Sequence, residues 1–305
     1  MALDIYRAVT NRILELLDQE LVPWRQPIRV AGGGMPSNLV TKMPYRGVNV
    51  FLLGMTAWAE GYGSSHWLTF RQARERGGYV RQGERGSLVI FWKQHATTDR
   101  ETNEPVNIPV LRHYRVFNTD QCEGLSKEAE EPETMKPFEP ITEAKSIVEG
   151  YKAPPDIKHG GHRAFYRPSD DLIRVPEPER FVNSESYYAT LFHELAHSTG
   201  HRSRLDRGLE HAGRTLADDA YSKEELIAEM GAAFLAAAAG ISPPTIEQSA
   251  SYIENWSRRL RGDKKLVVQA AGAGQRAADW ILGQHGHTEA IRDIASPVPS
   301  TRVHD

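Results

Sequence analysis

The stretch that decides the fold of this chain reads Leu191-Phe192-His193-Glu194-Leu195-Ala196-His197-Ser198-Thr199-Gly200. Two histidines four residues apart on a helix lie on one face, so both imidazoles can reach the same metal ion. Glu194 follows His193 directly, and its carboxylate therefore lies beside the ion, where it can take a proton from the attacking water. The pattern predicts the zincin arrangement, with His193 and His197 as metal ligands and Glu194 as the catalytic base.

The residues around this stretch favour a helix. Ser184 is a suitable N-cap, Glu185 suits the first turn, and Gly200 suits the position after the helix end. The alternative interpretation is a pair of surface histidines on a helix that binds no metal.

A catalytic zinc site normally has three protein ligands, so a third ligand must come from elsewhere in the chain. Glu225 and Glu229 lie four residues apart and share one face of a predicted helix over residues 223–239. We expect Glu225 to be the ligand and Glu229 to be its neighbour or the alternate ligand. His201 follows Gly200, which is expected to end the helix and turn this imidazole away. Two solvated surface glutamates are the alternative.

Length and composition indicate a protein of two domains. The chain has 305 residues, of which 40% are hydrophobic, and this length is more natural for two domains than for one. It contains no run of 18 apolar residues and begins with no signal-peptide pattern, so we expect a cytoplasmic protein without a membrane span. The single cysteine, Cys122, excludes an intramolecular disulfide and a cysteine-based metal cluster.

The charge is distributed unevenly along the chain. Residues 1–120 hold 15 Lys and Arg against 11 Asp and Glu, whereas residues 121–150 hold 3 Lys against 8 Glu. The acidic segment is also punctuated by proline, which is typical of a linker. We therefore predict domains over residues 1–125 and 150–305, joined by an acidic linker over residues 126–149. The basic first domain favours a polyanionic partner, and ordinary surface variation is the alternative.

Sequence periodicity predicts an α+β fold in both halves. Helices are expected over residues 3–21, 67–78, 142–149, 223–239, 245–260 and 264–282, with Thr69 as the cap of the one over 67–78. Residues 45–53 are expected to lead into a further helix that runs to about Ala59. Strands are expected as a strand, turn and strand over residues 79–92, a third strand over 110–117 after a loop over 94–109, and a hairpin over 163–175.

Aromatic and basic residues are interleaved in the first half. Single-strand nucleic-acid binders combine a basic track for phosphates with aromatic faces on which bases stack. The candidate DNA contacts are Trp24, Arg25, Tyr45, Arg46, Asn49, Trp67 and Lys93. The alternative is that the aromatic residues are half-buried members of the core.

Several segments resemble one protein family. Four segments of the first half resemble the N-terminal domain of the ArdC antirestriction proteins of conjugative plasmids. They are Tyr45-Arg46-Gly47-Val48-Asn49 and residues 67–73, 83–86 and 89–93. Residues 193–201 and 225–229 resemble the zincin-type metallopeptidase domain that follows it in those proteins. The resemblance covers nearly the whole chain, in order. A similar N-terminal domain also precedes plasmid primases, but no primase-like remainder is found here.

The resemblance implies a plasmid protein that binds single-stranded DNA and shields incoming plasmid DNA from restriction endonucleases in the recipient cell. By analogy with gluzincins, Glu225 matches the ligand and Glu229 its acidic neighbour. The expected cofactor is one divalent ion, with zinc favoured and manganese as the alternative. The expected partners are single-stranded DNA and a restriction-enzyme subunit or another protein substrate.

Two other functions remain open at this point. The first is a protein that protects DNA by occlusion, in which the zincin fold is a scaffold without catalysis. The second is a metalloprotease with no role in nucleic-acid binding, which an absence of single-stranded DNA binding would favour.

Overall fold

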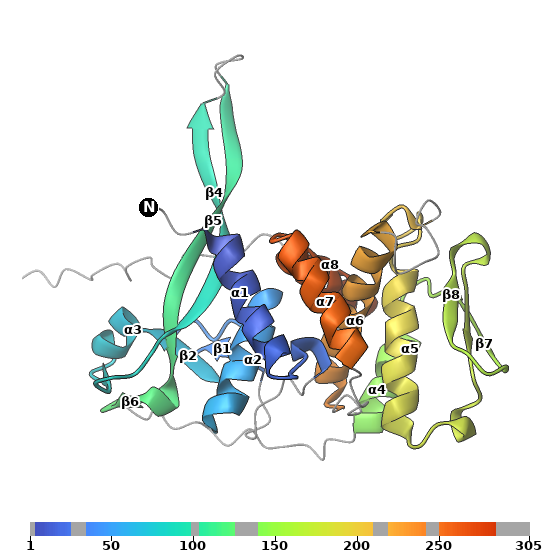
Figure 1. Cartoon of the computed structure of the whole chain (residues 1–305), viewed down its shortest axis with the longest axis horizontal. Helices are drawn as coiled ribbons and strands as arrows, with labels where there is room; N and C mark the ends of the chain where they lie inside the picture. Colours follow the sequence, from blue (N-terminus) through green and yellow to red (C-terminus); the bar gives the residue numbers. More distant parts are fainter. Residues whose placement is uncertain are drawn as a thin grey trace, which may run out of the picture.

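The computed structural model describes residues 4–25, 35–98, 104–125, 140–209, 219–241 and 250–284. The predicted α+β class is confirmed, because the described residues combine helices with three small sheets. A mainly helical centre lies between strands of the first half on one side and strands of the second half on the other (Figure 1). Within these ranges no helix is both long enough and apolar enough to cross a membrane.

The first half builds a four-stranded sheet with a helix packed on it. Its elements in chain order are α1 (Ile5–Asp18), η1 (Pro23–Arg25), β1 (Ser37–Asn38), α2 (Val48–Glu60), β2 (His66–Thr69), α3 (Phe70–Glu75), β3 (Tyr79–Val80), β4 (Ser87–Thr98), β5 (Pro105–Asn118), η2 (Thr119–Gln121) and β6 (Cys122–Glu123). The strand order of the large sheet is β1-β2-β5-β4. Asn49 of α2 joins the helix to β4, because its side chain accepts a hydrogen bond from the Ile90 amide and donates one to the Ile90 carbonyl.

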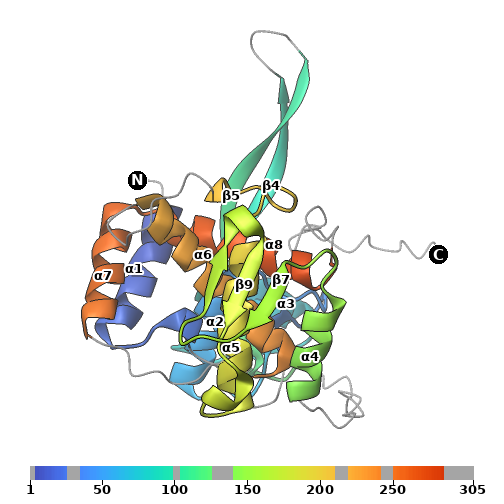
Figure 2. The ribbon, with the colours of Figure 1, turned by 90° about the vertical axis from the view of Figure 1, so that its right-hand side faces the viewer.

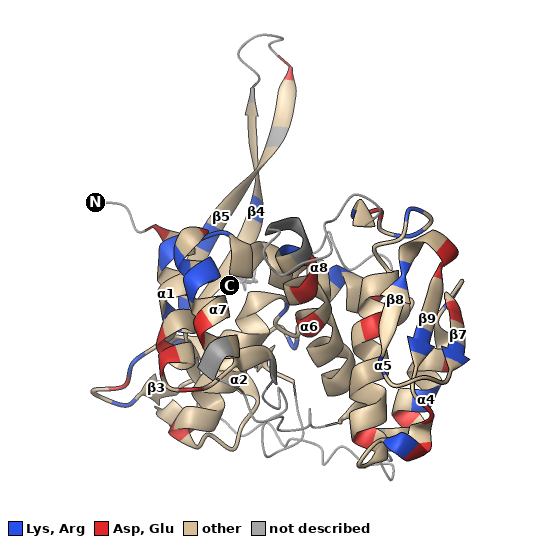
Figure 3. Cartoon of the chain, turned by 45° about the vertical axis from the view of Figure 1, so that its right-hand side comes forward, with Lys and Arg blue, Asp and Glu red and all other residues tan. Residues whose placement is uncertain are grey.

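The predicted hairpin over residues 79–92 is wrong. β3 pairs with β6, and β4 pairs instead with β5, in one antiparallel ladder from Ser87↔Val116 to Thr98↔Pro105. Most of the predicted loop over residues 94–109 is therefore strand. The ladder projects from the body of the protein (Figures 1 and 2), and basic residues lie near its base (Figure 3). The outer part of the ladder has no face packed on a core, so its sequence lacks the alternation of apolar and polar residues that identifies a half-buried strand.

The predicted helix over residues 67–78 begins later than expected. Trp67 and Leu68 belong to β2, where Trp67 pairs with Asn118 of β5. The cap itself is confirmed. The Thr69 hydroxyl accepts a hydrogen bond from the Gln72 amide at 3.2 Å, and the Gln72 side chain accepts one from the Thr69 amide at 2.8 Å. This reciprocal capping box ends the strand and starts α3.

The second half is a small sheet packed with helices. Its elements are α4 (Pro140–Gly150), β7 (Asp156–His159), β8 (Phe165–Arg167), η3 (Pro168–Asp170), β9 (Leu172–Val175), η4 (Pro178–Arg180), α5 (Ser184–Ser198), α6 (Asp219–Ala239), α7 (Ala250–Gly262) and α8 (Leu266–Ile281). The predicted hairpin is confirmed as β8 and β9, and β7, which was not predicted, adds in parallel to β9. Helix α4 buries Ala144 completely, so the end of the predicted linker packs into this half.

One hydrophobic core joins the two halves. Buried residues of α1 and α2 belong to the same cluster as those of α5, α6 and α8. Phe51 of α2 lies 4.9 Å from Phe234 of α6, and Trp24 of η1 lies 6.1 Å from Trp256 of α7, measured between ring centroids. Arg46 forms an ion pair with Asp279 of α8. The two halves are therefore packed as one body in this structure.

The shared core predicts that both halves unfold together. Phe51→Ala should lower the free energy of unfolding by about 3–5 kcal/mol, because it leaves a cavity against α6. Trp58→Ala, on the same helix but 57% exposed, should change it by less than about 0.5 kcal/mol. Hydrogen exchange followed by mass spectrometry through a urea titration measures each half separately. Two transitions, with only the first half shifted by Phe51→Ala, would contradict the shared core.

Candidate metal centre

Helix α5 presents the two histidines and is fixed at both ends. Its N-cap is Asn183, whose side chain accepts a hydrogen bond from the Ser186 amide at 2.8 Å, so the expected cap at Ser184 is one residue late. After the helix, Gly200 allows close packing, since a Cβ there would lie 2.7 Å from Cδ1 of Leu209. A larger residue at this position would force the side chains of Leu209 and Arg207, which return over the end of α5, to move.

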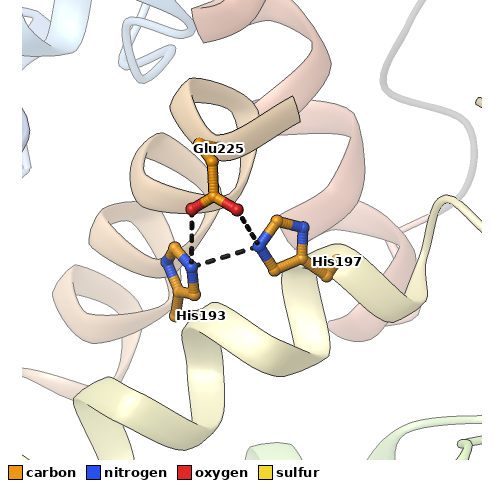
Figure 4. A group of neighbouring side chains, drawn as sticks. All are labelled: His193, His197 and Glu225. Carbon is orange, nitrogen blue, oxygen red and sulfur yellow. Dashed lines mark hydrogen bonds and ion pairs between the residues drawn. The ribbon is translucent and has the colours of Figure 1, made fainter. Parts of the chain in front are cut away.

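Three predicted ligands converge at the contact of α5 with α6. The Nε2 atoms of His193 and His197 lie 3.1 Å apart, and each lies 3.5 Å from one carboxylate oxygen of Glu225 (Figure 4). One ligand atom from each of the three residues falls within 4.8 Å of the others, and no second such trio of His, Cys, Asp or Glu is found among the described residues. Two imidazoles and one carboxylate aimed at a common point fit a zinc-type ion with one position left open.

The electrostatics of the trio also suit a cation. Burial by itself lowers the pKa of His193, but the hydrogen bond with Glu225 and the charges of Glu194, Glu229 and Glu225 raise the pKa to about 9. These carboxylates therefore create a strongly negative potential around the imidazole. The same potential stabilises a divalent ion in place of the proton.

The structure separates the two candidate glutamates. The Glu225 carboxylate faces both imidazoles, whereas Glu229 accepts a hydrogen bond from the hydroxyl of Tyr252 on α7 at 2.8 Å. His201, the other candidate, has its Nδ1 atom 2.8 Å from the Ser203 hydroxyl and does not join the trio. This geometry favours Glu225 as the third ligand and Glu229 as its neighbour.

Two residues that the sequence did not indicate hold His197 in place. Glu224 lies 3.2 Å from Nδ1 of His197, and Arg207 donates to both of its carboxylate oxygens, at 2.6 and 2.9 Å. Burial raises the pKa of Glu224, but Arg207 and His197 outweigh this and lower it, so Glu224 stays ionised. A carboxylate on Nδ1 keeps the proton there and leaves Nε2 free to bind a metal.

Arg207 and Arg204 also close the end of α5. Arg207 donates hydrogen bonds to the Ala196 carbonyl at 2.9 Å and to the Thr199 hydroxyl at 2.7 Å. Arg204 donates to the Ser198 carbonyl at 2.9 Å and forms an ion pair with Asp171 at 2.7 Å. These guanidinium groups satisfy carbonyls that the helix leaves unpaired, next to His197. Glu224 could have been suspected from its place beside Glu225, but the loop position of Arg207 gave no periodic signal.

Most of the predicted DNA contacts lie inside the protein. Trp24, Tyr45, Asn49 and Trp67 are between 0% and 4% exposed, so in this structure they offer almost no surface to DNA. The rings pack in the core and present no face to a base. Arg46 is held by Asp279.

The two remaining predicted DNA contacts are Lys93 and Arg25. The Lys93 side chain is exposed on β4. The side chain of Arg25 lies outside the described residues.

The comparisons with known proteins identify the class and then the family. Residues 142–273 match the family described as zincin-like metallopeptidase, in agreement with the fold and the histidine pair. Residues 3–117 match the N-terminal domain of the anti-restriction factor ArdC. The metal-free crystal structure of the antirestriction protein ArdC from plasmid R388 is 38% identical, with a TM-score of 0.73, and the match covers 92% of this chain and 97% of that one. This chain belongs to the ArdC antirestriction family.

Other similar proteins agree with this assignment. The Mn(II)-bound structure of the R388 protein is 37% identical, with a TM-score of 0.73, over 94% of this chain and all of that one. The uncharacterized protein y4eC of Sinorhizobium fredii is 36% identical over 94% of both chains. Two DNA primases named TraC from Escherichia coli are 33% and 32% identical over 91% of this chain, which spans only 27% and 20% of their length.

The geometry predicts different effects for the two glutamates of α6. Losing a residue that hydrogen-bonds to a metal ligand typically weakens metal binding by roughly 10–100-fold. Glu225→Gln should weaken the binding of Zn²⁺ or Mn²⁺ by more than this, because it removes a charged ligand. Glu229→Gln should stay within that range, since only nearby charge is lost. Isothermal titration calorimetry on both full-length variants makes the comparison. A larger loss for Glu229→Gln would reassign the ligand.

The contact with Glu224 predicts a separate effect on metal affinity. Glu224→Gln should weaken metal binding about 10–100-fold, because the ion pair with Arg207 that orients His197 is lost. Glu254→Gln, an exposed glutamate of α7, should leave the affinity unchanged. Chelator competition measures both, with thermal melts as a check on folding. An unchanged affinity in the folded Glu224→Gln protein would show that the contact does not position His197.

Proposed function

We propose that this protein is an antirestriction protein that binds single-stranded DNA and carries a metal-dependent peptidase centre. The observation that carries the peptidase part is the convergence of His193, His197 and Glu225, with Glu194 on the same helix. Restriction of incoming plasmid DNA takes place in the cytoplasm, which is where we expect the protein to act during conjugation.

The chemistry assigned to each residue follows from this geometry. A divalent ion held by His193, His197 and Glu225 would polarise a peptide carbonyl and make water more acidic. Glu194 would take the proton of the attacking water and pass it to the leaving amine. Glu224 holds His197 through Nδ1. Zinc suits two imidazoles and one carboxylate, and the Mn(II)-bound relative makes manganese the alternative.

The DNA-binding part rests on the family and on charge. The residues that match the ArdC N-terminal domain lie within the basic first half of the chain. A positive field of this kind attracts nucleic acid through its phosphates. The protein substrate of the metal centre is then a subunit of a restriction enzyme or another protein met at the incoming DNA.

A second candidate function is protection by DNA binding alone, with the metal centre as a scaffold. It is favoured by the two relatives named DNA primase, in which a region similar to this chain belongs to proteins named for DNA synthesis and not for proteolysis. The two candidates make opposite predictions for a variant that keeps the metal and loses the base.

The variant Glu194→Gln separates these functions. It should retain the ion, because Glu194 is not in the trio, and it should slow cleavage of a restriction-enzyme subunit at least about 100-fold. Glu179→Gln, an exposed glutamate ahead of α5, serves as the matched control. Gel analysis of the restriction enzyme and a DNA-protection assay are run side by side. Full protection by the folded Glu194→Gln protein would favour occlusion, and a wild-type protein with no affinity for single strands would remove the DNA-binding part.

A further inference from the structure

We infer that single-stranded DNA lies along one face of the β4–β5 ladder, in the groove lined by Lys93, His95, Val110, Arg112 and Tyr114. This inference rests on the proposed binding of single-stranded DNA and names the site at which it takes place. The groove has a volume of about 480 Å³ and is open to solvent. None of its residues belongs to the metal centre, and only Lys93 was expected from the sequence.

The charge of the ladder points to a polyanion. The two strands, Ser87–Thr98 and Pro105–Asn118, contain Lys93, Arg112 and Arg115 and no Asp or Glu. Figure 3 shows basic residues near the base of the ladder and acidic colour only near its tip, where Glu104 precedes β5. The positive charges of Lys93 and Arg112 beside one groove attract phosphates.

The register places the two cations on one face. Residues directly opposite each other in an antiparallel ladder project to the same side, and the side alternates along each strand. Arg112 pairs with Phe91, and the next pair on that side is Lys93 with Val110. The following pair is His95 with Ile108. The groove face therefore carries positive charge alongside rings.

Aromatic rings complete this face. Tyr114 and Phe91 lie 5.9 Å apart, and Phe91 lies 6.1 Å from the buried ring of Tyr45, which anchors the row in the core. Phe91 and Tyr114 are half-buried, so part of each ring faces solvent, and His95 beyond them is exposed. Rings that are held from behind and open in front can stack on bases, which the buried Trp24 and Trp67 cannot do.

The position of the ladder suits a long and flexible ligand. Its outer part stands clear of the helices in both views (Figures 1 and 2), so a strand of DNA can run along it without meeting the body of the protein. Ile108 on the groove face is 44% exposed, and an apolar side chain among cations and rings is typical of an interaction surface. A protein partner that binds this face would need a negatively charged surface.

The opposite face of the ladder supplies matched controls. Arg115 pairs with Leu88, and Trp92 pairs with Leu111, so both project away from the groove face. Arg115 lies three residues from Arg112 on the same strand, and Trp92 lies three residues from His95. Arg112 thus has a cationic counterpart on the other face, and His95 has an aromatic one.

The test uses the full chain and an unstructured oligonucleotide at several salt concentrations. For single strands the slope of log affinity against log salt is about −0.7 per phosphate contact, so Arg112→Ala should reduce its magnitude by about 0.7. If the variant and the wild-type protein have equal affinities at 1 M salt, Arg112→Ala should bind about fivefold more weakly than the wild type at 0.1 M salt. The double variant Lys93→Ala with Arg112→Ala should bind about 25-fold more weakly. Arg115→Ala should change the affinity by less than about twofold. At pH 8, His95→Ala should weaken DNA binding about fivefold and leave the salt slope unchanged, because a stacking ring is lost. Trp92→Ala should not weaken DNA binding.

Each outcome decides the inference. Thermal melts confirm that every variant is folded. An Arg115→Ala effect as large as that of Arg112→Ala, or wild-type affinity in the double variant, would overturn the groove as the binding site while leaving DNA binding itself intact. A double variant that keeps its DNA affinity but no longer binds a restriction-enzyme subunit would make the ladder a protein-docking surface. No binding by the wild-type protein would remove the proposed function as well.

Discussion

The close approach of α5, α6 and α8 is the constraint on which the candidate metal centre depends. A Cβ atom at Gly231 of α6 would lie 3.0 Å from Cβ of Ala196 on α5, and one at Gly274 of α8 would lie 2.9 Å from the Gly231 amide nitrogen. A methyl group at Gly274 would force the backbones of α6 and α8 to shift, and one at Gly231 would press against Ala196. Small residues thus let the helix backbones come close together, in the packing that places Glu225 against the two imidazoles.

This packing brings several ionisable groups into one partly buried region, where each must be compensated. Glu224 is balanced by Arg207, and Glu229 accepts a hydrogen bond from Tyr252, which in turn accepts one from Nε1 of Trp24. The last bond starts in the first half of the chain. A neighbour of the metal trio is thus tied to the half that we assign to DNA, and the shared core makes the two halves one packed body.

The sequence was most informative where chemistry and periodicity coincide. The spacing of His193 and His197 and the face of α6 that carries Glu225 were predicted, because a helix fixes which residues share a side. Arg207 could not be predicted, since its role depends on a loop that returns over α5. Tryptophan beside arginine does not reveal whether the ring is inside, and Trp24 and Trp67 are buried because a large ring contributes more to a core than to a surface.

The β4–β5 ladder shows the opposite difficulty. Its outer residues face solvent on both sides, so no alternation of apolar and polar residues marks them as strand, and the Gly-containing segment before β4 suggested a local hairpin that does not form. The most exposed element of the first half was therefore the least visible in the sequence.

The central claim is that His193, His197 and Glu225 bind one divalent ion. Anomalous diffraction from crystals grown with Mn²⁺ or Zn²⁺ tests it most directly. The account predicts one peak at about 2.0–2.2 Å from both Nε2 atoms and from a carboxylate oxygen of Glu225. A peak that is bound by Glu229 without Glu225, or no peak near the two histidines, would contradict it.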